Sequence, residues 1–121
     1  MINAHNKSLD ELVTAINQSR SKQYNQFNRN PSVKIRVWGD EKEWYEAFIS
    51  YNKWEDHWVL GVSFHGVNNQ GKRYLDSLSA KAYADIKLLC IQIMAWADVG
   101  PSRIHLSIKR WEGQRHACKI H

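Results

Sequence analysis

The stretch HWVLGVSFHG, residues 57–66, carries the clearest strand pattern of the chain. Its large apolar residues alternate with smaller or polar residues, so an extended backbone would have one apolar side. That side holds Trp58, Leu60, Val62 and Phe64. The segment therefore predicts a half-buried strand.

Two segments upstream alternate in the same way. Residues 33–37 place Val33, Ile35 and Val37 on one side of a strand. Residues 43–53, EWYEAFISYNK, could form either a helix or a strand, but Phe, Ile and Tyr favour a strand. In that strand one side holds Tyr45, Ala47, Ile49 and Tyr51, and the other holds Trp44, Glu46, Phe48 and Ser50. Turns are expected at Gly39-Asp40 and at residues 54–56.

Helices are expected on either side of these strands. Ser8 and Glu11 match a capping box, and an apolar stripe with helical spacing follows it, so a helix is predicted from residue 9 to about residue 27. After a loop over residues 67–73, a second helix is predicted to begin at a cap on Ser77 or Ser79 and to end at Gly100-Pro101. Its apolar stripe comprises Tyr83, Ile86, Leu89, Cys90 and Ile93, widened by Leu88, Met94 and Trp96.

The last stretch, PSRIHLSIKRWEGQRHACKIH, residues 101–121, alternates again through Ile104, Leu106 and Ile108. This pattern predicts a hairpin over residues 103–110 and 115–120, joined by residues 111–114. The expected order is α-β-β-β-α-β-β. Such an order predicts a single α+β domain over residues 1–121, with an antiparallel sheet of about five strands and two helices packed on one face.

Composition narrows the class of protein. With 121 residues, 43% of them apolar and 24% charged, the chain resembles a globular domain rather than a disordered segment. No apolar run reaches the ~18 residues of a membrane span, and the start lacks the apolar core of a signal peptide. A cytoplasmic location is expected. The two cysteines, Cys90 and Cys118, do not suggest a disulfide framework.

Charge is distributed unevenly along the chain. The net charge is +5, and residues 1–60 contain as many acids as Lys and Arg. The whole excess therefore comes from residues 61–121, and the last 21 residues are especially basic. This asymmetry indicates a polyanion or an acidic protein as partner.

The basic hairpin is the predicted binding surface. Its Lys and Arg side chains would neutralise backbone phosphates, and Trp111 at the hairpin tip would stack on an unpaired base. The alternative is that these charges only protect an edge strand from aggregation. The predicted binding residues are Arg103, His105, Lys109, Arg110, Trp111, Arg115 and Lys119.

Two other functions remain open. Six Trp and five Tyr suit a small inhibitor that blocks a partner protein, of the toxin-immunity or phage anti-defence type, and the acids of residues 40–46 could mimic phosphates. Alternatively, two histidines could serve as acid and base in metal-independent RNA cleavage. His57 and His65 lie eight residues apart on one strand, too far for one phosphate, so His105 or His116 would have to lie alongside one of them.

The chain lacks the usual parts of an enzyme or a cofactor site. It has no glycine-rich phosphate loop and no Gly-x-Ser-x-Gly elbow. His116, Cys118 and His121 would not converge on a strand, so no metal and no cofactor are expected. The sequence therefore favours a non-catalytic protein that binds nucleic acid or a protein partner.

Overall fold

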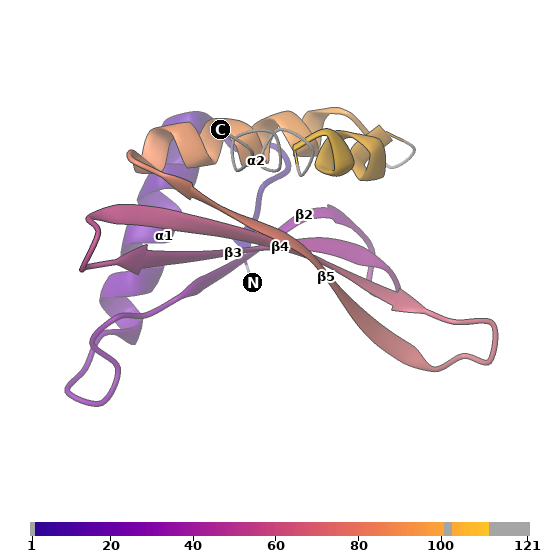
Figure 1. Cartoon of the computed structure of the whole chain (residues 1–121), viewed down its shortest axis with the longest axis horizontal. Helices are drawn as coiled ribbons and strands as arrows, with labels where there is room; N and C mark the ends of the chain where they lie inside the picture. The colour runs from indigo at the N-terminus through magenta and orange to yellow at the C-terminus, as the bar shows by residue number, and fades with distance from the viewer. Residues whose placement is uncertain (1, 101–102, 112–121) are drawn as a thin grey trace.

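The computed structural model describes residues 2–100 and 103–111, with the backbone alone for residues 77–79. Five strands form one sheet in the order β1-β2-β3-β4-β5 over these residues (Figure 1). The elements are β1 (Ile2–Asn3), α1 (Leu9–Gln23), β2 (Val33–Gly39), β3 (Trp44–Asn52), β4 (His57–Val67), β5 (Arg73–Tyr83) and α2 (Ile86–Asp98). Residues 103–111 are also helical. The predicted α+β class is confirmed.

The three strands predicted from alternation form the middle of the sheet. Ile35 lies opposite Ala47, which in turn lies opposite Val62, so their side chains share one face. All three are buried. The neighbouring row of Val33, Ile49 and Leu60 is buried in the same way. Period-two alternation thus places the predicted core residues of β2, β3 and β4 on one face of the sheet.

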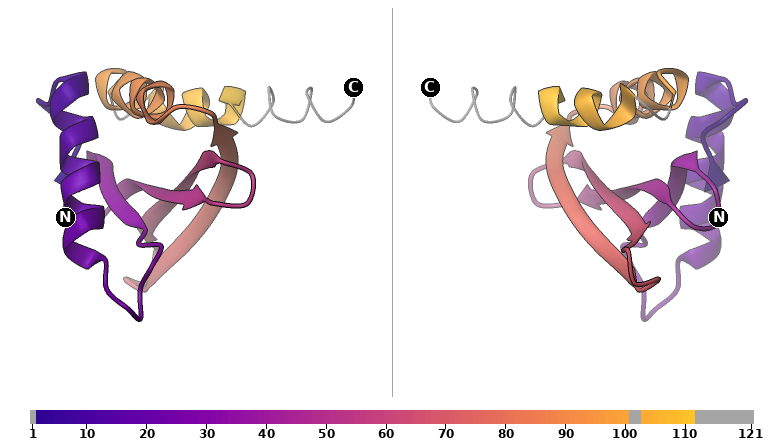
Figure 2. Two further views of the ribbon diagram at one scale, coloured as in Figure 1. Left: turned by 90° about the vertical axis from the view of Figure 1, so that its left-hand side faces the viewer. Right: turned by 90° about the vertical axis from the view of Figure 1, so that its right-hand side faces the viewer.

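The helices lie on that same face (Figure 2). Helix α1 begins at the predicted capping box, where the Ser8 hydroxyl accepts the Glu11 N–H and the Glu11 carboxylate accepts the Ser8 N–H. It buries Leu12 and Ile16. It ends at Gln23, earlier than predicted, because the chain turns at Tyr24 and the next aromatic, Phe27, is 90% exposed.

The second helix begins later than the sequence suggested. Ser77 and Ser79 lie in β5 rather than at a helix cap, and Tyr83 ends that strand. The actual cap is Asp85, whose side chain accepts the Lys87 N–H at 2.8 Å. Leu89, Cys90 and Ile93 are buried as predicted, whereas Leu88 faces solvent. Strand β5 was missed because an edge strand needs few large apolar residues.

The predicted C-terminal hairpin is wrong over residues 103–111, which are helical. Ile104, Ile108 and Trp111 are buried, at the i, i+4, i+7 spacing of one helix face. Leu106, which a strand would have buried beside them, is 54% exposed. The predicted second strand, residues 115–120, lies outside the described residues.

The sheet is mixed rather than antiparallel throughout. Strand β1 pairs in parallel with β2, with Ile2 opposite Ile35, while the other three pairings are antiparallel. Only three of the five strands observed are therefore strands that the alternation predicts. None of the described helices is long and apolar enough to cross a membrane.

Candidate functional site

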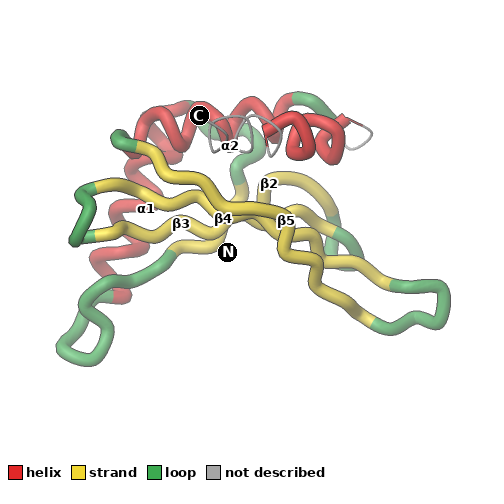
Figure 3. The backbone as a smooth tube through the Cα atoms, in the orientation of Figure 1, coloured by secondary structure: helices red, strands yellow, loops and turns green. Residues whose placement is uncertain are grey.

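The helices leave one side of the sheet uncovered (Figure 3). The strand registers place a set of polar and aromatic residues on that side. Cross-strand pairing sets them in two neighbouring rows. One row joins Arg36, Glu46 and Ser63, and the next joins Trp44 and His65. Strand β5 adds Arg73, which lies opposite Val67 beyond the second row. We refer to these six residues, Arg36, Trp44, Glu46, Ser63, His65 and Arg73, as the open-face cluster.

A buried carboxylate lies at the centre of the cluster. Glu46 is only 2% exposed although no described helix covers this side of the sheet. Its carboxylate pairs with His65 Nε2, and the imidazole itself is partly exposed. Removing a carboxylate from water is costly unless it is paired, so the contact with His65 is what makes the position tolerable.

Trp44 organises the aromatic and cationic groups around that pair. Its indole lies parallel to the His65 ring, with centroids 4.3 Å apart and planes at 9°. The guanidinium carbon of Arg36 lies 5.0 Å from the indole centroid, and that of Arg73 lies 5.9 Å from it. Both distances suit cation–π attraction. Two like charges from strands that are not neighbours are thereby held over one ring.

Polar groups without partners are concentrated at the same place. The described residues contain four buried side-chain nitrogen or oxygen atoms with no hydrogen-bond partner, and three are Arg36 Nε, Trp44 Nε1 and Ser63 Oγ. Each such group costs about 1–3 kcal/mol. All three can donate a hydrogen bond, so the cluster has an excess of donors over acceptors. Because these atoms are buried, they add a cost to the folded state and are not open to a ligand at the surface.

The turn between β2 and β3 sets the position of Trp44. Gly39 has φ +124°, and a Cβ there would lie 2.3 Å from the Glu43 carbonyl oxygen, so only glycine fits. Asp40 Oδ1 accepts the N–H groups of Lys42 at 2.8 Å and Glu43 at 3.0 Å. These amides lower the pKa of Asp40. The chain therefore enters β3 at a fixed point, with Trp44 as its first residue.

The predicted binding residues lie elsewhere. Arg103, His105, Lys109 and Arg110 are exposed on the helical segment 103–111, on the opposite side of the sheet from the cluster. Trp111 is 3% exposed, donates its indole N–H to the Tyr83 hydroxyl at 2.9 Å and so belongs to the core. Its predicted role in base stacking is wrong. The remaining predicted residues, Arg115 and Lys119, lie outside the described residues.

The three described histidines named for RNA cleavage, His57, His65 and His105, do not converge. His65 belongs to the cluster, His57 pairs with Glu55 at 3.5 Å near the other end of β4, and His105 Nδ1 lies 3.0 Å from the Tyr45 hydroxyl on the helix side. The two-histidine arrangement needed for RNA cleavage is therefore not formed by these three. His116, Cys118 and His121 fall outside the described residues.

The described residues form neither a cluster of metal ligands nor a reactive thiol. No group of three His, Cys, Asp or Glu side chains there could hold a metal ion. Cys90 is buried in the core, and burial raises the pKa of its thiol to about 12. A thiol with such a pKa remains protonated and unreactive at neutral pH.

Sequence reasoning missed the residues of the cluster as a site, although part of the signal was present. The alternation of β3 already places Trp44 and Glu46 on the side opposite the core. A carboxylate flanked by aromatic residues on a strand is unusual enough to single out. What the sequence could not supply was the cross-strand register that sets Glu46 beside Arg36 and Trp44 beside His65.

Comparison with protein-family models, with curated proteins and with solved structures gives no match to this chain. What the open-face cluster does must therefore be argued from its own geometry and chemistry.

Proposed function

We propose that this protein binds single-stranded nucleic acid on the open face of its sheet. The observation that carries the proposal is the pair of guanidinium groups, from Arg36 and Arg73, held over the indole of Trp44. Arginine pairs with phosphate through two parallel hydrogen bonds, and its planar group also stacks on bases. The three side chains together offer a strand both charge and flat surface.

The charge around the cluster supports this choice of ligand. Lys34 follows the same side of β2 and is exposed, which adds a third cation. Among the described strand side chains that lie on the open face, the one carboxylate is Glu46, and it is already paired with His65; Asp76 of β5 lies opposite Phe64, on the other face. Phosphates approaching the strands of this face therefore meet positive charge, and the nearest unpaired carboxylates lie in the β2–β3 turn.

The shape of the surface favours a single strand over a duplex. Reading the major groove needs an element that protrudes, such as a helix, whereas a sheet surface with aromatic groups receives splayed bases. Phe48 is half-buried beside the Arg36–Glu46 row and provides a second aromatic group for a base. Stacking of this kind contributes about 1–3 kcal/mol per base.

A second candidate function is protein binding through the outer side of α2. Leu88 and Ile91 lie three residues apart on that helix, and about half of each side chain is exposed. Exposed apolar pairs on one helix face suit a protein partner. This observation favours the inhibitor class over an enzyme, with the partner docking on the helix layer rather than on the open face.

The proposal is tested by fluorescence polarisation with a labelled oligouridylate at about 50 mM salt. We expect the double variant Arg36→Gln/Arg73→Gln to bind at least about tenfold more weakly than the wild type. The matched control is Arg103→Gln/Lys109→Gln, which removes two exposed charges from the helix layer and should leave the affinity nearly unchanged. Thermal melting confirms that both variants fold.

Two outcomes would overturn the proposal: no binding by the wild type, or equal loss of affinity in both double variants. In the first case, a protein partner should be sought by capture on the wild-type protein. We expect the variant Leu88→Glu to abolish that capture. A gel of the same mixtures shows whether the RNA is shortened. Cleavage would add a catalytic role for the Glu46–His65 pair.

A further inference from the structure

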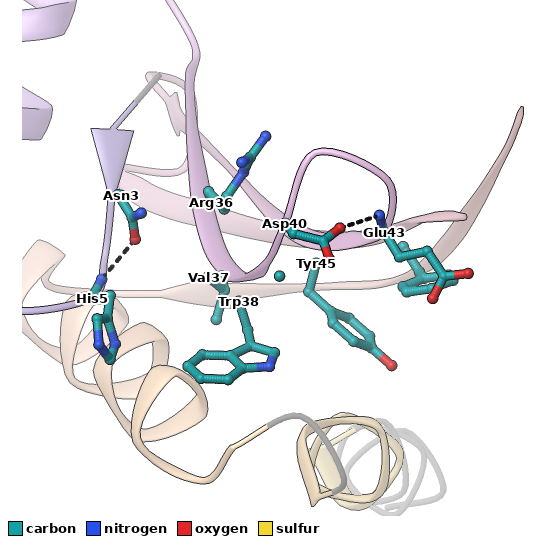
Figure 4. A pocket seen from close by; sticks show the side chains of 10 residues that line it. Asn3, His5, Arg36, Val37, Trp38, Asp40, Glu43 and Tyr45 are labelled. Atoms are coloured by element: carbon teal, nitrogen blue, oxygen red, sulfur yellow. Dashed lines mark hydrogen bonds between the residues drawn. The ribbon is translucent and has the colours of Figure 1, made fainter. Parts of the chain in front are cut away.

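A second site lies on the opposite side of the same strands. A pocket of about 650 Å³ opens beside the end of β2 and the start of β3. Its walls include His5, Trp38, Asp40, Glu43, Tyr45 and Phe64. Figure 4 shows His5, Trp38 and Tyr45 pointing to one side of the sheet and Arg36 pointing to the other. The pocket therefore opens on the opposite side of the sheet from the open-face cluster, although Arg36 belongs to both.

Aromatic rings form the walls of the pocket. The register shifts between Arg36 and Trp38, so that Trp38 lies opposite Tyr45 and shares its face of the sheet. The Tyr45 and Phe64 rings are 4.8 Å apart at their centroids, and the His5 ring meets Trp38 edge-on at 5.7 Å. His105 Nδ1, from the helical segment 103–111, lies 3.0 Å from the Tyr45 hydroxyl and fixes that ring.

Carboxylates stand at the rim of the pocket. Asp40 is held in the turn by two backbone N–H groups, which lower its pKa and keep it ionised at neutral pH. Burial, the Tyr74 phenol and the charge of Glu43 raise the pKa of Tyr45, so its hydroxyl stays neutral. Arg36 also lines the pocket edge, and its guanidinium lies over Trp44 on the other side of the sheet, from where its charge makes a smaller contribution to the lowered pKa of Asp40.

We propose that this pocket binds an organic ammonium cation, with the charged nitrogen against the faces of Trp38 and Tyr45. Aromatic faces attract cations, most strongly quaternary ammonium groups that are poorly hydrated. The negative charges of Asp40 and Glu43 add long-range attraction for the cation. The volume of about 650 Å³ is that of an ordinary small-molecule site.

The first test compares choline with 3,3-dimethylbutan-1-ol, which has the same shape but no charge. Binding is followed by the indole N–H signals of the protein in ¹⁵N NMR spectra. We expect choline to shift the Trp38 signal and to bind at least about tenfold more tightly than the neutral alcohol. Equal binding of the two compounds, or no binding of choline, would overturn the proposal.

A second pair of probes identifies the source of the cation. Nα-acetyl-Nε-trimethyllysine amide presents the same trimethylammonium group on a peptide-like stem. Tighter binding of this compound than of choline would assign the pocket to a methylated lysine side chain, and the reverse order would assign it to a free small molecule. Either order supports the ammonium site itself.

Variants tie the binding to the pocket and separate it from the open face. Glu43→Gln, at the rim, should weaken choline binding several-fold, and Trp38→Leu should abolish it, with thermal melting used to confirm folding. The matched controls are Trp54→Leu, a tryptophan 97% exposed in the β3–β4 turn, and Trp44→Leu in the open-face cluster. If neither Glu43→Gln nor folded Trp38→Leu changed the affinity for choline, the cation would not bind in this pocket. None of these outcomes depends on whether nucleic acid binds.

Discussion

Glu46 is a buried carboxylate on the open face of the sheet. The alternation of β3 puts it on the side away from the core, yet it is 2% exposed and depends on one partner, His65. A buried carboxylate whose partner is removed loses the interaction that offset its desolvation. The two side chains should therefore be strongly coupled in the stability of the fold.

We predict that Glu46→Gln and His65→Gln each lower the free energy of unfolding by about 1–3 kcal/mol. In the double variant the cost should be smaller than the sum, with a coupling energy of about 0.5–3 kcal/mol. Urea unfolding followed by tryptophan fluorescence measures all three. The control is His57→Gln, whose partner Glu55 is exposed, and which should change stability by less than about 0.5 kcal/mol. Additive single effects would contradict the pairing.

The capping box makes a pH-dependent prediction at the same scale. The Ser8 N–H and then the Ser8 hydroxyl lower the pKa of Glu11 below 4.5. The pKa of Glu11 is lower in the folded than in the unfolded state. The stabilisation of the fold by ionised Glu11 is therefore fully present above pH 4.5 and is lost as pH falls through the folded pKa. Glu11→Gln should therefore reduce stability at about pH 7 and have a smaller effect at about pH 3, as urea unfolding at both pH values would reveal. An equal effect at both pH values would contradict this account.

The elements of the fold could be predicted where one period dominates the pattern. In β4, large apolar residues recur at every second position from Trp58 to Phe64, and the predicted strand is confirmed. Ile104 and Ile108 are four residues apart, a spacing that suits both a strand and a helix. Only Leu106, lying between them, separates the two, and its exposure could not be known in advance. Strand β1 is two residues long and carries no pattern at all.

The helical assignment of residues 103–111 leads to a prediction that a strand would not share. Ile108→Ala should destabilise the fold by about 2–5 kcal/mol, because Ile108 is fully buried and the change leaves a cavity. Leu106→Ala should change stability by less than about 0.5 kcal/mol, since that side chain faces solvent. A strand would bury both side chains, so similar costs for the two variants, measured by thermal or urea unfolding, would contradict the helix.

At the scale of the whole molecule, the basic character noted in the sequence is divided between two sides. Arg103, Lys109 and Arg110 lie on the helix layer, while Arg36 and Arg73 lie on the open face. The sequence could show the excess of positive charge but not this division. Arg36 and Arg73 come from β2 and β5, which are joined only through β3 and β4, so their meeting at Trp44 depends on three strand registers.

The salt dependence of binding tells these two sides apart. Each phosphate neutralised on a single strand contributes about 0.7 to the slope of log affinity against log salt concentration. We predict that Arg36→Gln/Arg73→Gln reduces the magnitude of that slope by about 1.4 for an oligouridylate, because two phosphate contacts are lost. Arg103→Gln/Lys109→Gln should leave the slope unchanged, although it removes the same net charge. Polarisation titrations between about 50 and 200 mM salt measure both slopes. If instead only the second pair reduces the slope, the helix layer is the nucleic-acid surface and the open face is not.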